Sequence, residues 1–180
     1  LRRAEIQWFY QEGCSWIYPD AWQDYRDAIP EAERGDFVAA YYKRLTSTDT
    51  DVRRTAARAW SIWEGSCSRL QAAGDVAARF GAGDFAEAFA RIECHYFINH
   101  GFFERDDWLL ENVNRIRHIP ATIVQGRYDV ICPMRSAWDL HCAWPEADLQ
   151  ISPDAGHAAS EPGNTQRLIA ATNRYATDAV

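Results

Sequence analysis

The sequence predicts an α/β fold in which a long helical region precedes a short parallel sheet. Two short runs, 121–126 with its β-branched Thr-Ile-Val and 148–152, are separated by a helical segment, which is typical of parallel strands joined by a crossover. Upstream, as far as about Asn114, apolar residues recur at helical spacing. Only two strand candidates occur, and the chain begins at Leu1 within a helical pattern. We therefore expect one segment of a larger protein.

The composition is that of an ordinary globular protein. The chain has 180 residues, 47% of them hydrophobic, and its formal net charge of −7 argues against nucleic acid and anionic membranes as partners. No apolar run approaches the roughly 20 residues of a membrane span, and residues 1–6 lack the pattern of a signal peptide. The five cysteines form no CxxC pair or zinc spacing, so we expect reduced thiols and a cytoplasmic location.

Local signals predict where the first helices begin. The range 19–28 opens with a proline, which fits the first turn of a helix, and Asp36 can cap a second helix through Leu45. Asp49 or Asp51 can start a third, longer helix. Its apolar positions recur at helical spacing and are Val52, Ala56, Ala59, Trp60, Trp63 and Cys67.

A glycine-rich stretch interrupts the helical region. Residues 74–83 contain three glycines and are the clearest predicted loop. After this loop, Asp84 and Glu87 have the spacing of a capping box, in which two side chains satisfy free amides at a helix start. The pattern predicts a helix from Phe85 to about Asn99.

Chemistry-bearing residues follow both predicted strands. Asp129 comes shortly after the first strand, and Gly156 and His157 come shortly after the second. Carboxyl ends of parallel strands meet at one edge of a sheet, so the acid and the imidazole are expected to lie close together. Each residue alone is also compatible with an ordinary loop position. Together they match the last two members of a nucleophilic triad in the chain order Ser, Asp, His.

Two glutamates lie on otherwise apolar helical stripes. Glu64 follows Trp60 by four residues, and Glu93 has phenylalanines four residues away on both sides. A buried carboxylate is costly unless it is paired. One interpretation is a salt bridge to a nearby arginine such as Arg69 or Arg91. The other is a pair of carboxylates that binds a cationic ligand.

Several segments together resemble one known family, the proline iminopeptidases, over nearly the whole chain. They are Trp60–Gly65, Ala90–Phe97, Gly126–Asp129, Ala137–Leu140 with Ala143–Ala147, and Ala155–His157 with Glu161-Pro162. The resemblance implies an α/β-hydrolase fold fragment that corresponds to the carboxyl-terminal part of the family. Residues 1–114 would form the helical cap domain, and residues 115–180 the last two strands and helices of the core.

The resemblance also implies an activity and roles for particular residues. Proline iminopeptidases are serine peptidases that release an N-terminal proline from peptides, without a cofactor. By this resemblance His157 would act as general base and then acid, Asp129 would orient it, and Glu64 and Glu93 would bind the terminal amine of the substrate. Phe9, although aromatic residues are more often core, is the candidate wall for the proline ring. Cys132 is expected as a thiol near the site, and no metal site is suggested.

The nucleophile is not found in the sequence. No G-x-S-x-G occurs, and no glycine-rich oxyanion turn is present, so these residues by themselves are expected to be inactive. The missing amino-terminal half of the hydrolase core is the partner that would supply both. Two alternatives remain, namely another capped hydrolase such as an esterase or epoxide hydrolase, and a non-catalytic remnant. The paired glutamates disfavour the first alternative because neutral substrates leave such charges unmatched.

Overall fold

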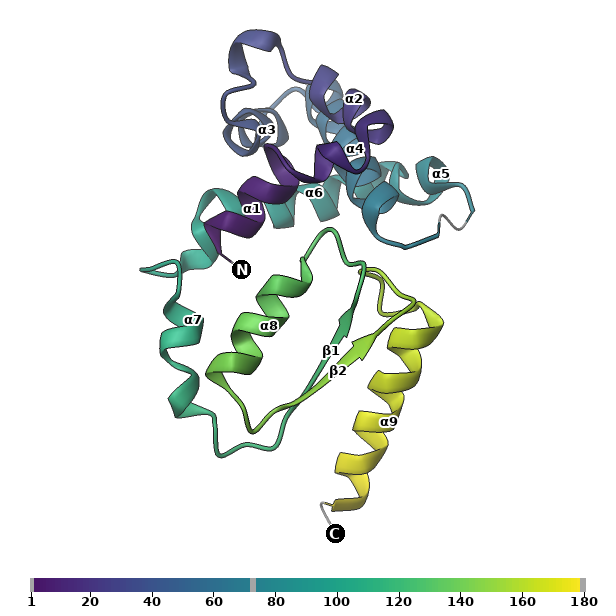
Figure 1. Ribbon diagram of the computed structural model, residues 1–180. Helices are drawn as coiled ribbons and strands as arrows, with labels where there is room; N and C mark the ends of the chain where they lie inside the picture. The colour runs from purple at the N-terminus through teal and green to yellow at the C-terminus, as the bar shows by residue number, and fades with distance from the viewer. Residues whose placement is uncertain (1, 72–73, 179–180) are drawn as a thin grey trace. The chain divides into compact units, whose positions relative to one another are not determined.

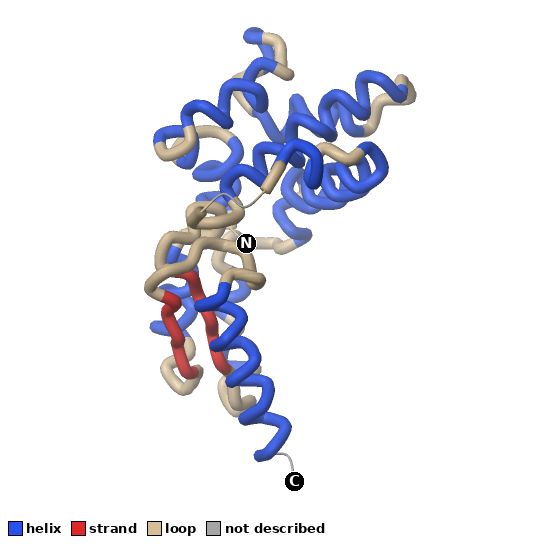
Figure 2. Tube along the Cα trace, turned by 90° about the vertical axis from the view of Figure 1, so that its right-hand side faces the viewer, coloured by secondary structure: helices blue, strands red, loops and turns tan. Residues whose placement is uncertain are grey.

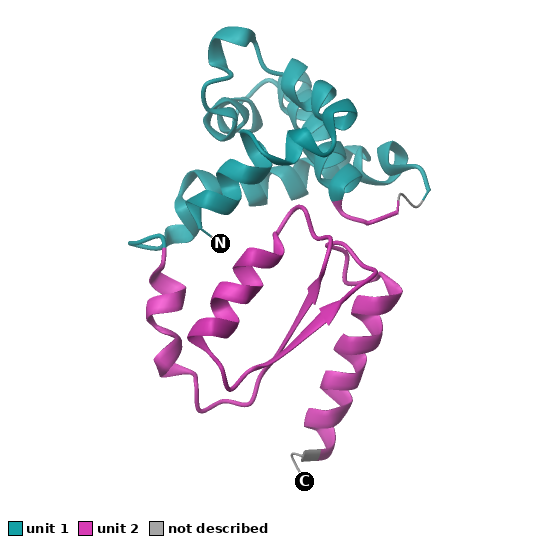
Figure 3. Ribbon diagram, in the orientation of Figure 1, with its two compact units in different colours: residues 1–67, 72–106 teal, residues 68–71, 107–180 magenta. Residues whose placement is uncertain are grey.

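The computed structural model describes residues 2–71 and 74–178, which form two compact units (Figures 1 and 3). The described residues of the first unit are 2–67 and 74–106, and those of the second are 68–71 and 107–178. The contacts therefore divide the chain after residue 106, whereas the sequence-based domain division at residue 114 stays a prediction. Within the described residues, no helix combines the length and the apolar character needed to cross a membrane.

Within its described residues, the first unit has helices as its only regular secondary structure. Its elements are α1 (Arg3–Tyr10), η1 (Cys14–Trp16), α2 (Pro19–Asp27), η2 (Glu31–Glu33), α3 (Phe37–Leu45), α4 (Thr50–Cys67), α5 (Val76–Phe80), α6 (Gly83–Ile98) and η3 (His100–Phe102), where η denotes a 3₁₀ helix. The long helix α4 packs against α2, α3, α5 and α6. The helical prediction for this region is confirmed.

Three predicted helix starts are confirmed in the first unit. Pro19 occupies the first turn of α2, where its missing N–H costs nothing. The Asp36 side chain accepts a hydrogen bond from Ala39 N at 2.9 Å and caps α3. Asp49 accepts from the amides of Asp51 and Val52 at 2.9 and 3.3 Å, and so caps the start of α4.

Aromatic side chains form the core of the first unit. Rings from α1, α2, α3 and α4 lie against one another; for example, Tyr25 stacks on Tyr41 with ring centroids 4.6 Å apart. Stacked and edge-to-face aromatic pairs add to the stability that burial alone provides. The largest fully buried rings are those of Phe9, Tyr25, Tyr41, Trp60 and Trp63.

Two predictions around the glycine-rich stretch are wrong. Residues 74–83 are not only loop, because α5 lies within them and is capped by Asp75, which accepts from Ala78 N at 2.9 Å. The capping box of Asp84 and Glu87 does not form, since α6 already begins at Gly83 with Ala82 at the cap position.

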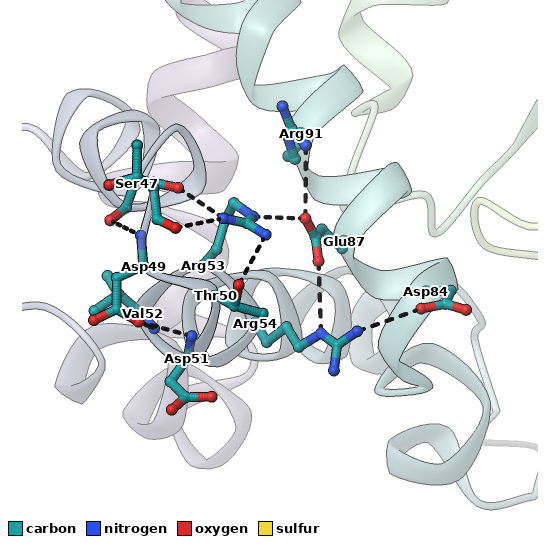
Figure 4. Close-up of polar contacts among 11 residues, drawn as sticks. Ser47, Asp49, Thr50, Asp51, Val52, Arg53, Arg54, Asp84, Glu87 and Arg91 are labelled. Atoms are coloured by element: carbon teal, nitrogen blue, oxygen red, sulfur yellow. Dashed lines mark hydrogen bonds and ion pairs between the residues drawn. The ribbon is translucent and has the colours of Figure 1, made fainter.

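The side chains of the predicted capping box bind arginines of α4 and α6 (Figure 4). Arg53 Nε lies 2.7 Å from Glu87 Oε1, and Arg54 Nη2 lies 3.7 Å from Asp84 Oδ1. Arg91, one turn further along α6, also reaches Glu87 at 3.6 Å. Because α6 begins one residue before Asp84, that side chain is not at the cap position, and Glu87 is engaged by arginines of α4 and α6.

The second unit is built on a small parallel sheet. Its elements are α7 (Trp108–Glu111), η4 (Val113–Arg115), β1 (Thr122–Gly126), α8 (Met134–Ala143), β2 (Asp148–Ser152) and α9 (Pro162–Asp178). Strands β1 and β2 pair in parallel, with Thr122 opposite Asp148 and Gly126 opposite Ser152. Helices α8 and α9 lie on opposite faces of this sheet (Figures 1 and 2). The predicted pair of parallel strands with a helical crossover is confirmed.

Candidate functional site

The loops that follow β1 and β2 continue side by side beyond the sheet. Tyr128 N donates to Ala155 O at 3.0 Å, which brings the two loops together where the strands end. Gly126 permits this approach, because a Cβ at this position would lie 2.0 Å from the Gly156 carbonyl oxygen. The sequence therefore needs a glycine here for reasons of space.

These loops bring Asp129 and His157 into contact. Asp129 Oδ2 lies 3.0 Å from His157 Nδ1. A carboxylate can only accept hydrogen bonds, so Nδ1 carries the proton and Nε2 is the nitrogen directed away from the acid. The predicted meeting of acid and imidazole at the carboxyl ends of the strands is present in the structure.

The surroundings of Asp129 hold its carboxylate in place. Asp129 is 8% exposed, and its Oδ1 accepts from the amides of Ile131 and Cys132 at 3.0 and 2.8 Å. Gln125 Nε2, from the end of β1, donates to Oδ2 at 3.2 Å. These donors satisfy the buried charge and fix the carboxylate in the direction of His157.

His157 combines a fixed ring with access to solvent. Its side chain is 40% exposed, so the ring can reach a bound molecule. The hydrogen bond with Asp129, followed by that with Cys132, raises the pKa of His157 to about 10. The predicted near-site thiol thus contacts the imidazole, and Cys132 is also exposed to solvent.

The first unit contains a second arrangement of acidic residues. Tyr10 OH, from α1, donates to Glu64 Oε1 on α4, and Trp60 Nε1 donates to Glu93 Oε2 on α6 at 2.9 Å. The rings of Tyr10 and Trp60 stack with centroids 4.4 Å apart and planes inclined by 19°. Both carboxylates thus border one pair of stacked aromatic rings.

The pKa of the Tyr10 hydroxyl depends on burial and on both glutamates. Burial is the main cause that raises the pKa of Tyr10 well above its usual value, and the charges of Glu64 and Glu93 add to this effect. Glu64 is itself only 5% exposed, whereas Glu93 is half-buried. Two carboxylates thus lie near one buried phenol.

The arginines considered as salt-bridge partners make other contacts. Arg91 pairs with Glu87 at 3.6 Å. Arg69 belongs to the second unit, where it donates to Ser160 Oγ. Phe9 is 1% exposed and stacks on Trp63 with ring centroids 5.1 Å apart, so its ring belongs to the core. The role of Phe9 as a pocket wall stays a prediction.

Three residues that contact the candidate site residues were not predicted from the sequence. Tyr10 was noted only as part of an aromatic triplet, Trp60 as a core position, and Gln125 as part of a strand. Gln125 carried the clearest available signal, because it is a polar side chain next to the end of an otherwise apolar strand. In residues 2–71 and 74–178, no group of three or more His, Cys, Asp or Glu side chains could hold a metal ion.

No model of a known protein family matches the chain. Individual curated proteins do match it. The chain is 60% identical over 175 residues to a probable proline iminopeptidase of Leptolyngbya boryana, which covers 97% of this chain and 54% of that protein. It is 55% identical to the proline iminopeptidases of Xanthomonas citri and Arabidopsis thaliana, over 98% and 97% of this chain and 56% and 46% of theirs.

The matches cover nearly all of this chain but only part of each relative. The chain spans about half the length of the curated relatives it matches. The two-stranded parallel sheet with a helix on each face is compatible with the carboxyl-terminal region of an α/β-hydrolase. Identity above 50% over nearly all of the chain leaves one family assignment: the chain belongs to the proline iminopeptidases and corresponds to their carboxyl-terminal part.

Proposed function

We propose that this chain supplies the acid–base half and the amine-binding residues of a serine exopeptidase that releases N-terminal proline from peptides. The observation that carries the proposal is the 3.0 Å contact between Asp129 and His157 beyond two adjacent parallel strands. Kinship with proteins named proline iminopeptidase gives the substrate class. A serine in the amino-terminal half of the protein would be the nucleophile.

In the proposed mechanism, His157 transfers the protons. The raised pKa of His157 keeps its ring protonated at neutral pH, so Nε2 must first lose its proton. The neutral ring, with Nδ1 held by Asp129, then takes the proton of the serine hydroxyl on Nε2 as that oxygen attacks the carbonyl carbon of the terminal proline. The imidazolium then donates this proton to the departing nitrogen of the next residue. Water, activated by the same imidazole, releases proline from the serine ester. Asp129 orients the ring and stabilises its positive charge at each step.

Specificity for a free amino terminus is assigned to Glu64 and Glu93. A protonated proline nitrogen would gain charge-assisted hydrogen bonds from carboxylates, whereas an internal peptide nitrogen has neither the charge nor the second hydrogen. Tyr10 and Trp60 orient the two carboxylates through neutral donors. This arrangement favours an aminopeptidase over an esterase or epoxide hydrolase, whose substrates are neutral.

The remaining parts of the proposal concern organisation and location. The helical unit would be the cap domain of the hydrolase, with Phe9 contributing to the side of the proline pocket. A cytoplasmic location is supported by five cysteines that are all free thiols. The loss of the nucleophile in a non-catalytic remnant is the remaining alternative, which an activity measurement on the full-length protein decides.

The test uses the full-length protein with a chromogenic amide of proline. Asp129→Asn should lower kcat by up to about four orders of magnitude, because the ring loses the partner that holds its tautomer and charge. Asp148→Asn is the matched control, since Asp148 starts β2 at the opposite end of the sheet and pairs with Arg174 on the surface. Near-normal turnover in a folded Asp129→Asn variant would remove this acid from the mechanism. A wild-type protein that releases no proline would refute the proposed activity.

A further inference from the structure

A buried carboxylate outside the contact of Asp129 and His157 holds the backbone that carries His157. Glu161, directly before α9, is 6% exposed. Its Oε1 accepts from Gly156 N at 2.8 Å, and its Oε2 accepts from Leu70 N at 3.1 Å. One side chain thus joins the residue before His157 to a segment that lies 91 positions earlier in the sequence.

That earlier segment, 68–71, is itself part of the support. Ala158 N donates to Ser68 O at 2.8 Å, so the amide after His157 is fixed as well as the amide before it. A Cβ on Gly156 would lie 2.9 Å from Leu70 N and 3.3 Å from Glu161 Oε1, which shows how closely the two backbones approach. The histidine loop is therefore anchored on both sides of its functional residue.

The chemistry of this junction requires a carboxylate. Two amide N–H groups converge on Glu161, and an ionised carboxylate is acceptor-only at both oxygens. A glutamine of the same shape would offer one oxygen and one NH₂ group. The NH₂ group would face an N–H donor, and one buried amide would lose its partner.

We propose that Glu161 is a positioning residue that fixes the imidazole of His157 relative to Asp129 by holding Gly156 and segment 68–71 with one carboxylate. Its kinetic consequence rests on the proposed aminopeptidase function, but its structural consequence does not. Asn164 complements it from α9, because its Nδ2 donates to the carbonyl oxygens of Gly156 and Ala158, each at 3.1 Å. Glu161 binds backbone amides and not the imidazole, so it acts on the reaction only through the position of His157.

The experiment compares Glu161→Gln with wild type in the full-length protein. Loosening the loop should lower kcat by about 10- to 100-fold, because displacements near 1 Å in a catalytic group have effects of this size, while KM changes by less than about twofold. In parallel, NMR of isotope-labelled histidine, assigned with His157→Ala, follows the titration of the His157 ring. Its pKa should fall toward about 6.5 as the contact with Asp129 weakens. Glu146→Gln, which removes a surface carboxylate paired with Arg117 in the same unit, should change neither quantity.

The two readouts separate the possible failures. A Glu161→Gln variant that is less heat-stable but keeps the wild-type kcat and His157 pKa would show a purely structural role and overturn the proposal. If the wild-type protein released no proline, the proposed function would fail, and the titration alone would decide the role of Glu161. Should Glu161→Gln not fold, Glu161→Asp takes its place, because it keeps both acceptor oxygens on a shorter side chain. The shorter side chain cannot hold both Gly156 N and Leu70 N at their present distances, so an unchanged kcat and pKa in that variant would show that the double contact is not needed and overturn the proposal.

Discussion

Replacing Glu64 or Glu93 by glutamine tests whether the acidic pair reads the amino terminus of the substrate. Each replacement removes one charge and keeps a side-chain oxygen that can still accept from Tyr10 or Trp60. The fold should therefore survive, which makes the change informative about ligand binding. We expect both variants, in the full-length protein, to lose kcat/KM toward substrates with a free N-terminal proline.

The size of the loss follows from the burial of the carboxylates. Glu64 is 5% exposed, so a cation bound to its carboxylate would have little contact with water. A hydrogen bond to a charged group contributes about 1.5–3 kcal/mol. Because about 1.4 kcal/mol corresponds to a factor of ten, kcat/KM should fall by about 10- to 150-fold for each variant.

The assay compares a free prolyl amide with the same amide after N-acylation. The acylated compound carries no positive charge, so it should be a poor substrate for wild type and lose little further in either variant. Glu87→Gln is the matched control, because Glu87 lies on the same helix as Glu93 but pairs with Arg53 at 2.7 Å. Equal losses on the free and acylated substrates would refute the amine-binding role and assign both glutamates to the support of the fold.

Two further predictions concern the surroundings of His157. Because its folded-state pKa of about 10 exceeds the unfolded value of about 6.5, the contact with Asp129 stabilises the protein fully below pH 6.5 and loses this effect as the pH rises through 10. Denaturant unfolding between these pH values should therefore show a larger decrease in stability for wild type than for Asp129→Asn; parallel decreases would contradict the assigned contact. Cys132 is an exposed thiol beside the imidazole, so a bulky mercurial should inhibit wild type, whereas Cys132→Ala should stay active and lose most of that inhibition. A folded but inactive Cys132→Ala would contradict the assignment of the nucleophile to a serine.

Secondary structure was predictable where the signal and its effect lie close together in the chain. Asp36 caps α3 through an amide three residues away, and each strand coincides with a short run of its own sequence, TIVQG in β1 and DLQIS in β2. The capping box failed because α6 begins at Gly83 and Glu87 has its partner 34 residues earlier, at Arg53. No local pattern announces such a contact, since it depends on the packing of α4 against α6.

The same distinction applies to the candidate sites. Asp129 and His157 could be paired from the sequence because the geometry of parallel strands brings their carboxyl ends together. The residues that hold them come from contacts that no strand rule specifies. Glu161 reaches Leu70 across 91 residues, and Tyr10 reaches Glu64 across 54. Sequence patterns thus indicated which groups could react, whereas the structure indicates what holds those groups in position.

On helix α6, tertiary contacts give two glutamates different kinds of partner. Glu87 and Glu93 are glutamates on one helix, and both were expected to have partners. Arg53 and Arg91 surround Glu87 with positive charge and lower the pKa of its carboxyl, the hydrogen bond from Arg53 being the main cause. Glu93 accepts the indole N–H of Trp60, a neutral donor that orients the carboxylate. Glu87→Gln therefore removes a carboxylate that arginines already hold, whereas Glu93→Gln removes one that the proposed function assigns to the substrate amine, and the two variants are expected to differ for that reason.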